Sequence, residues 1–241
     1  MATYRYLRTA LRATSRGPAI AVACGTAQSA KHIEKQTNAT PSLGERTGQA
    51  MTPIQEDRGL RVVVIVGSVR EGRFGAQVGD WVSKHLIESG ADAQLIDLAD
   101  LYFPNSMAIH QDVISFGEAI DRADAIIVVT PEYNHSFSGP LKTAIDALRA
   151  QWQAKPVGFV SYGGIARGLR AVEALRLVFA ELHAVTVRET VSLHNPWGQA
   201  DSSHAGWMGQ EAANALVTMI RQLEWWADAL RAARNRKPYP G

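Results

Sequence analysis

Hydroxyl, guanidinium and glycine groups gather in the segment 67–75, which reads GSVREGRFG. Ser68 can donate a hydrogen bond, and Arg70 and Arg73 carry forked cations that match the oxygens of a phosphate. The segment leaves a run of β-branched residues and enters a helical pattern, so backbone amides at the helix start are free to bind an anion. The spacing therefore predicts a phosphate-binding loop. The alternative is a glycine-rich turn with solvated arginines.

Two common phosphate motifs do not fit this loop. In a P-loop, GxxxxGK[ST], Gly67 and Gly72 have the right spacing, but Phe74 stands where a hydroxyl must ligate magnesium. In the dinucleotide motif GxGxxG, Val69 occupies the position of the second glycine. The segment thus favours a mononucleotide, such as FMN, over a nucleoside triphosphate or a dinucleotide.

Two later segments also follow apolar runs, and they contain groups that suit a flat ring. Residues 130–142 read TPEYNHSFSGPLK, and residues 161–168 read SYGGIARG. The first supplies an aromatic surface with several donors and acceptors, and the paired glycines of the second let the backbone approach a ligand closely. Each segment has the alternative reading of a polar surface loop, and His135 that of an ordinary loop histidine.

Strands and helices must alternate to bring these three segments together. The residue pattern predicts five helices, at 75–89, 116–122, 139–150, 168–182 and 209–234. It predicts five strands, at 61–67, 93–98, 125–130, 156–161 and 186–193. Such alternation indicates a doubly wound parallel sheet, in which ligands bind where the strands end. The three segments are therefore expected at one edge of the sheet.

Composition excludes several classes of protein. The chain has 241 residues, 46% of them hydrophobic, and no apolar run long enough to cross a membrane. The single cysteine leaves no internal disulfide, and the seven histidines show no close metal-ligand pairing. Beyond residue 50 the chain has 18 basic and 21 acidic residues, so a nucleic-acid partner is not expected. We expect no metal site and no membrane partner.

The first part of the chain differs from the rest. Residues 1–50 carry seven Lys or Arg and two acidic residues, and residues 37–58 mix Thr, Gly, Pro and Gln without a strand pattern. We expect an extension at 1–58 that is disordered or a targeting segment, a globular domain at 59–236 and a tail at 237–241. Met51 is an alternative start. The expected location is cytoplasmic, or organellar if residues 1–50 are a transit peptide.

The chain from about 61 to 195 resembles the NADPH-dependent FMN reductase family of flavodoxin-like proteins. The resemblance rests on GSVREGRFG, TPEYNHSFSGPLKTAIDAL and SYGGIARGLRAVEALR. It implies an α/β three-layer sandwich whose five-stranded parallel sheet has the order 2-1-3-4-5, with helices on both faces. It also implies noncovalently bound FMN and assembly as a homodimer or homotetramer.

The resemblance further implies which residues form the site. Those at the FMN phosphate would be Ser68, Arg70, Arg73, Phe74 and Gly75. Those bordering the ring would be Pro131, Glu132, Tyr133, Asn134, Tyr162, Gly163 and Gly164. Many family members have Ser or Asn at the position of Gly75, so we expect only backbone contacts there.

The implied activity is transfer of hydride from NADPH (or NADH) to FMN, and then of electrons to a flavin, quinone or similar small molecule. Flavin performs this chemistry, so no catalytic side chain is expected. Arg167 or Arg170 is a candidate for a 2′-phosphate. Trp225 and Trp226 cannot both follow the apolar stripe of the last helix, so one is expected to face a partner subunit or both to edge into the core. The alternatives are a flavodoxin-like electron carrier and a non-catalytic nucleotide-binding regulatory module.

Overall fold

Five parallel strands form one sheet in the order β2-β1-β3-β4-β5. The computed structural model describes residues 59–106, 108–199 and 209–241. The strands are β1 (Arg61–Val66), β2 (Asp92–Asp97), β3 (Ala125–Pro131), β4 (Pro156–Gly163) and β5 (Val185–His194). This order is the flavodoxin-like one, so the fold expected from the sequence is confirmed.

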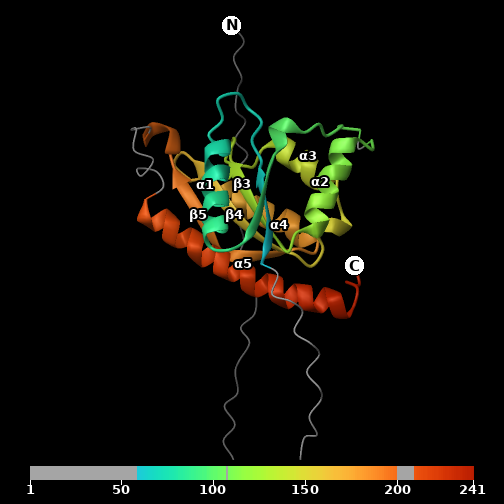
Figure 1. The fold of residues 1–241 in the computed structure, drawn as a ribbon. Helices are drawn as coiled ribbons and strands as arrows, with labels where there is room; N and C mark the ends of the chain where they lie inside the picture. The colour runs from blue at the N-terminus through green and yellow to red at the C-terminus, as the bar shows by residue number, and fades with distance from the viewer. Residues whose placement is uncertain (1–58, 107, 200–208) are drawn as a thin grey trace, which may run out of the picture. The chain divides into compact units, whose positions relative to one another are not determined.

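Helices cover both faces of the sheet, which gives three layers (Figure 1). One face carries α1 (Gly75–Glu88) and α5 (Gln210–Arg236). The other carries α2 (Gln111–Arg122), α3 (Gly139–Asp146) and α4 (Leu169–Glu181). Three short 3₁₀ helices complete the described elements: η1 (Leu98–Asp100), η2 (Ala150–Trp152) and η3 (Pro196–Gln199). No helix in the described ranges is long and apolar enough to span a membrane.

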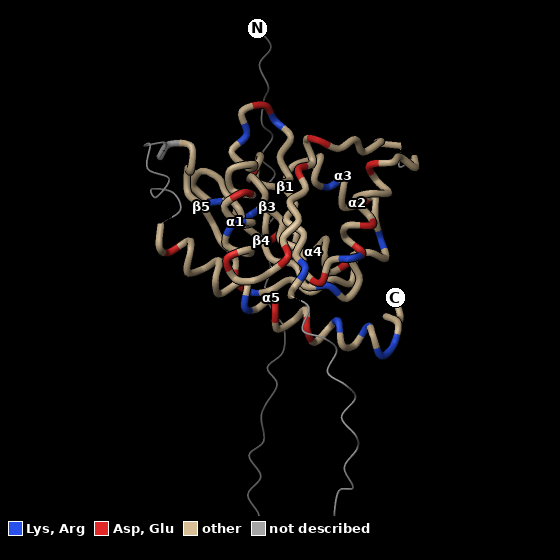
Figure 2. The backbone as a smooth tube through the Cα atoms, viewed as in Figure 1, with Lys and Arg blue, Asp and Glu red and all other residues tan. Residues whose placement is uncertain are grey.

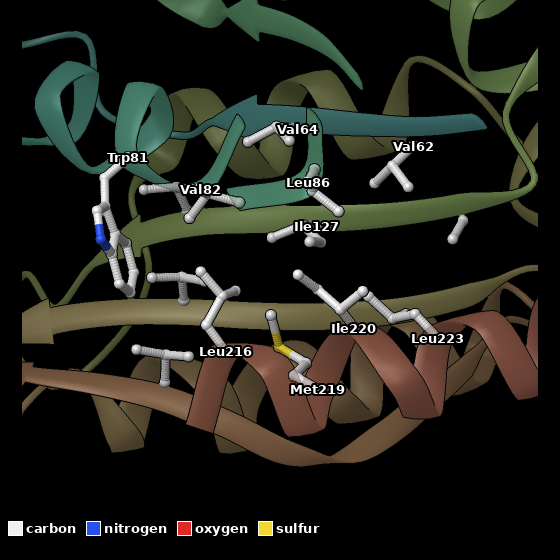
Figure 3. Packing of buried hydrophobic residues seen from close by; sticks show 14 of the residues in the cluster. Val62, Val64, Trp81, Val82, Leu86, Ile127, Leu216, Met219, Ile220 and Leu223 are labelled. Carbon is white, nitrogen blue, oxygen red and sulfur yellow. The ribbon is translucent and has the colours of Figure 1, made fainter. Parts of the chain in front are cut away.

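The central strands are buried on both faces because their β-branched side chains alternate between two cores. Val64 and Ile127 point into the layer under α1 and α5, whereas Val63 and Ile126 point into the opposite layer. Figure 3 shows α5 packing its apolar stripe, with Leu216, Met219, Ile220 and Leu223, toward these strands. Each fully buried side chain of this size contributes about 1.5–3 kcal/mol. Packing on the sheet therefore stabilises α5, whose buried residues recur every three to four positions along one face of the helix.

Two helices differ from their expected bounds. The helix expected at 116–122 begins five residues earlier, at Gln111, because the His110 side chain accepts a hydrogen bond from Asp112 N and caps it. The residues of this first turn are largely exposed and lack apolar periodicity, so the pattern did not reveal them. The helix expected at 139–150 ends at Asp146. There the chain turns to bury Trp152, whose indole nitrogen donates to Ile145 O.

A buried charged cluster lies near the amino end of the sheet. Asp124 is 1% exposed, and its carboxylate accepts from Arg61 Nε and Arg231 Nη1, each at 3.4 Å. Beside it, Lys155 Nζ donates to Ile120 O and to Asp121 O, the latter at 2.6 Å. Burial lowers the pKa of Lys155 to about 8, against the opposing charge of Asp121. This cluster closes the end of the sheet away from the three candidate loops.

The expected extension at 1–58 lies outside the described residues, and so do Met51 and Cys24. The last helix ends at Arg236, and residues 237–241 are not helical. The division into extension, domain and tail remains a prediction.

Candidate functional site

The loop after β1 is supported from beneath by a buried pair of hydroxyl groups. Ser68 is fully buried, and Tyr162, at the end of β4, donates its hydroxyl to Ser68 Oγ at 3.1 Å. Burial raises the pKa of Tyr162 to about 12, and the hydrogen bond to Ser68 opposes this shift. Tyr162 therefore stays neutral at ordinary pH and holds the loop after β1 against β4.

Gly75, the first residue of α1, fits where no side chain can. A Cβ at this position would lie 2.5 Å from Ser68 Oγ and 2.8 Å from Tyr162 Oη. The buried hydroxyls thus fill the room that a Ser or Asn side chain would need. A side chain at position 75 would therefore collide with both hydroxyl groups. Gly75 therefore presents only its backbone to the loop after β1.

The start of α1 is open to an anion. Phe74 is the N-cap residue and makes no side-chain capping hydrogen bond, and the first turn of α1 contains no acidic residue. The helix dipole and the free first-turn amides therefore favour a negatively charged group at this position.

The two arginines of the loop are held differently. Arg73 Nη2 donates to Asp97 Oδ2, at the end of β2, at 2.5 Å. Its Nε is buried and has no hydrogen-bond partner among the described residues. The Arg70 guanidinium lies over the ring of Tyr133, 4.0 Å from the centroid. Arg73 is thus fixed with one donor free, whereas Arg70 bridges the first and second candidate loops.

The second loop is tightly folded. Tyr133 and Ser136 exchange two backbone hydrogen bonds, and the residues between them, Asn134 and His135, have positive φ angles of 48° and 75°. Glu132 N donates to Tyr162 O, which joins this loop to the end of β4. His135 is exposed, and no contact in the structure assigns it a role.

An ion pair ties the second loop to α4. Arg170 Nη1 donates to Glu132 Oε1 at 3.1 Å. The Glu132 side chain is 10% exposed and that of Arg170 is 47% exposed, so the pair lies partly in solvent. Arg170 is therefore already engaged by Glu132, whereas Arg167, at φ 52°, stands exposed in the turn before α4.

Seven of the expected site residues line one hollow of about 270 Å³. They are Arg70, Arg73, Phe74, Pro131, Glu132, Tyr133 and Tyr162. Ser68 and Gly75 lie beneath its wall, where both approach Tyr162 Oη. Asn134, Gly163 and Gly164 do not line it. The hollow is slightly smaller than the ~300–1,000 Å³ usual for small-molecule sites, and Arg70 lies across it on Tyr133.

Two residues that the sequence did not single out belong to this region. Trp197, in η3, lines the hollow and is 53% exposed. Asp97 fixes Arg73 from β2. The signal that could have identified Trp197 is the alternation of elements, because it places the end of β5 at the same sheet edge as the other strand ends. Nothing in the local sequence paired Asp97 with Arg73, 24 residues away.

A larger hollow of about 490 Å³ lies on the other side of the phosphate loop. It is lined by Val69, by the segment after β2 and by the start of α3, with Tyr102, Pro140 and Thr143 in its wall. The sequence predicted no site there. In the described part of the chain, no group of three or more His, Cys, Asp or Glu residues lies close enough to hold a metal ion.

A doubly wound sheet in the order 2-1-3-4-5 defines a flavodoxin-like fold, and the β1 loop, the β3 loop and the end of β4 line one hollow at the edge where ligands of such sheets bind. The family model of the NADPH-dependent FMN reductases matches residues 60–198, more than half of the chain. The chain belongs to this family.

Several relatives are named for such activities. An NAD(P)H-dependent FMN reductase of Schizosaccharomyces pombe is 33% identical over 118 residues, 43% of this chain and 58% of that protein. A quinone reductase of Pseudomonas putida is 33% identical over 140 residues, 53% of this chain and 75% of that protein. The chain spans less than two thirds of the length of the yeast relative.

The fold also matches solved structures. The flavoenzyme NAD(P)H:acceptor oxidoreductase FerB of Paracoccus denitrificans superposes with a TM-score of 0.55 at 23% identity, covering 72% of this chain and 98% of that one. At this level of identity the likeness concerns the fold alone.

Proposed function

We propose that this protein binds FMN and acts as an NAD(P)H-dependent oxidoreductase. Hydride would pass from NADPH (or NADH) to the flavin, and electrons then to a flavin, quinone or similar small acceptor. The observation that carries the proposal is a single hollow that combines a cation with aromatic side chains. Arg73, whose buried Nε has no partner among the described residues, lines it beside the uncapped start of α1. Tyr133 and Tyr162 line the same hollow. Membership of the reductase family supports the same conclusion.

The residues present fit FMN. Ser68, Arg70, Arg73, Phe74 and Gly75 would hold its phosphate. Arg73 Nε is a buried hydrogen-bond donor without a partner among the described residues, and a phosphate oxygen would satisfy it. At Gly75, which has no side chain, the phosphate can approach the backbone amides. Arg70 would exchange the face of Tyr133 for a phosphate oxygen, since a charge-assisted hydrogen bond is stronger than a partly exposed cation–π contact.

The ring would lie against the second and third loops. The residues that would border it are Pro131, Glu132, Tyr133, Asn134, Tyr162, Gly163 and Gly164. Bound flavin accepts hydride and releases electrons by its own chemistry. The protein would bind and orient the flavin with groups that are themselves fixed. Tyr162 stays neutral and is hydrogen-bonded to Ser68. The Glu132 side chain accepts from Arg170, and the Glu132 amide donates to Tyr162 O.

Binding of FMN and of riboflavin tests the proposal. FMN should bind at least about tenfold more tightly, because only FMN has the phosphate. Arg73→Ala should reduce this preference by about tenfold to a hundredfold, the effect of one charge-assisted contact of about 1.5–3 kcal/mol. Arg188→Ala, at a side chain 91% exposed on β5, is the matched control. Equal dissociation constants for FMN and riboflavin would refute the phosphate site.

The anaerobic response to NADPH separates the three classes of function. Rapid bleaching of bound FMN supports the reductase. Bound FMN that NADPH does not reduce supports an electron carrier, and a protein that binds no FMN supports a regulatory module. A panel of flavins, quinones and azo dyes, with NADPH or NADH as donor, then identifies the acceptor and the preferred nucleotide.

Assembly and location are also proposals. We propose a homodimer or homotetramer, as the family resemblance implies, and a cytoplasmic location, with an organelle as the alternative. Sedimentation analysis tests the first. N-terminal sequencing of the native protein tests the second, because recovery of Met1 or Ala2 at the N-terminus would exclude a cleaved transit peptide.

A further inference from the structure

The outer surface of α5 carries a large exposed aromatic residue. The helix buries Leu216, Met219, Leu223 and Ala227 against the sheet. On its far side Trp225 is 63% exposed, while its neighbour Trp226 packs against the core. The two indole rings meet edge to face, 5.0 Å apart. The expectation that both edge into the core is therefore wrong, and Trp225 is available to a partner.

Two charges around Trp225, one basic and one acidic, have the spacing of a self-complementary pair, and a third, Glu224, is half-buried beside it. Arg221 lies one turn before Trp225 and Asp228 nearly one turn after it, and both are exposed. Arg221 makes no ion pair with any other described residue, and Asp228 pairs only with Arg231 on its own helix, at 2.7 Å, among the residues that the structure describes. Figure 2 shows a basic position followed by acidic positions in the middle of α5, and basic positions toward its C-terminal end. A second α5 running antiparallel would therefore place opposite charges against each other.

We propose that α5 pairs antiparallel with α5 of a second copy of this chain, about a two-fold axis beside Trp225. In that register Arg221 of each copy faces Asp228 of the other, and the two Trp225 rings meet at the axis. A two-fold interface is self-complementary in this way, because each contact occurs twice. Large aromatic residues at the centre of such interfaces contribute most to affinity.

The position of the axis suits the length of the helix. Counting from Arg221 to Asp228, the axis falls between residues 224 and 225, close to the midpoint of Gln210–Arg236. Each 27-residue helix is about 40 Å long, and the two would overlap along most of it. On the other face, α4 also exposes an apolar side chain, Leu177, but its charges Arg170 and Arg176 already pair with Glu132 and Glu173. Of these two described helix faces, that of α5 is the one that leaves a cation free for a second copy.

Two complementary charge reversals test the pairing. Arg221→Asp should dissociate the interface because the introduced carboxylate would face Asp228 of the second copy. Asp228→Arg should do the same by placing two cations together. An equimolar mixture of the two variants should associate as a heterodimer. In the heterodimer, position 221 of each copy again faces a residue of opposite charge at position 228 of the other. Sedimentation and native mass spectrometry of the full chain measure the assembly and distinguish the heterodimer by mass.

The controls separate this interface from misfolding and from other interfaces. Lys84→Asp reverses a 75%-exposed cation on α1 and should leave the assembly unchanged. Trp225→Ala should weaken association at least about tenfold, as expected of a central aromatic residue, while leaving the thermal midpoint of the dissociated subunit unchanged. If the protein forms a tetramer, Arg221→Asp should yield a dimer.

Three results would overturn the pairing. The wild-type chain could be monomeric, as expected if residues 1–58 or another partner covers Trp225. The single charge reversals could leave the assembly intact, which would place the interface elsewhere. The mixed variants could fail to associate although each is folded. None of these results bears on FMN binding, which is measured separately.

Discussion

Replacing Gly75 by Ala tests the geometry beneath the phosphate loop. The added Cβ would lie 2.5 Å from Ser68 Oγ and 2.8 Å from Tyr162 Oη, closer than van der Waals contact allows. Forcing the site apart costs about 1–3 kcal/mol, and loss of the Tyr162–Ser68 hydrogen bond about 1 kcal/mol more. Ala restricts the unfolded chain more than Gly does and has a higher helix propensity, which together stabilise the folded protein by up to about 1 kcal/mol. We expect a net loss of about 1–4 kcal/mol in the free energy of unfolding.

The chain contains a matched control for this change. Gly139 is the first residue of α3, as Gly75 is of α1, and a Cβ there would meet nothing within 4 Å. Gly139→Ala should therefore be neutral or stabilise by up to about 1 kcal/mol. Chemical denaturation of each variant measures both effects.

A double-mutant cycle identifies the cause. Ser68→Ala removes the oxygen nearest the new Cβ, so Gly75→Ala should cost at least about 1 kcal/mol less in the Ser68→Ala background. Gly75→Ala should also weaken FMN binding. If it destabilises the protein no more than Gly139→Ala, or if the cycle shows strict additivity, the crowding derived from the structure is incorrect.

Three further predictions concern other parts of the molecule. Lys155 has a folded-state pKa of about 8, below its unfolded value, so the unfolded chain binds more protons between pH 8 and 10.5 and stability rises with pH there. Relative to Lys155→Met, the wild-type protein should gain about 2 kcal/mol in the free energy of unfolding from about pH 7 to 9.5, and a difference that does not change with pH would contradict this. Trp197→Ala should weaken FMN binding about fivefold, measured by flavin fluorescence, with Trp197→Phe retaining most of the affinity. Arg167→Ala should raise KM for NADPH about tenfold and leave KM for NADH unchanged. Arg170→Ala should have a smaller effect on KM for NADPH, because Arg170 is already paired with Glu132. Equal changes of KM for both nucleotides would exclude a contact between Arg167 and the 2′-phosphate.

The fold was predictable because its central strands carry the simplest signal. The run of β-branched residues in β1 and the apolar run of β3 are buried on both faces, and the spacing of apolar residues marks the helices between strands. The errors fell where a side chain, rather than periodicity, sets the boundary. His110 caps the first turn of α2, which is only partly buried, and the helix α3 ends where the chain turns to bury Trp152.

The candidate site was predictable only in part. Loop composition together with strand order was sufficient to expect that the β1, β3 and β4 loops converge. Pairings across the sheet were not visible in the sequence, because they depend on register. The Arg73–Asp97 pair and the Tyr162–Ser68 hydrogen bond join residues 24 and 94 positions apart. The second of these also leaves no room for a side chain at Gly75, a constraint that the sequence did not reveal.

Ser138 has a consequence for how the site tolerates change. Its hydroxyl donates to Gly67 O and accepts from Leu141 N, so one buried group fixes the exit of β1 and the start of α3 together. Between these anchors each loop has an exposed tip, at Glu71 and Gly72 in the first loop and at His135 in the second, and these tips lie outside the residues proposed to hold FMN. Insertions and exchanges at these tips can therefore alter which molecules the protein accepts without disturbing the frame. Directed evolution of its specificity should sample these tips and leave Gly67 and Ser138 untouched.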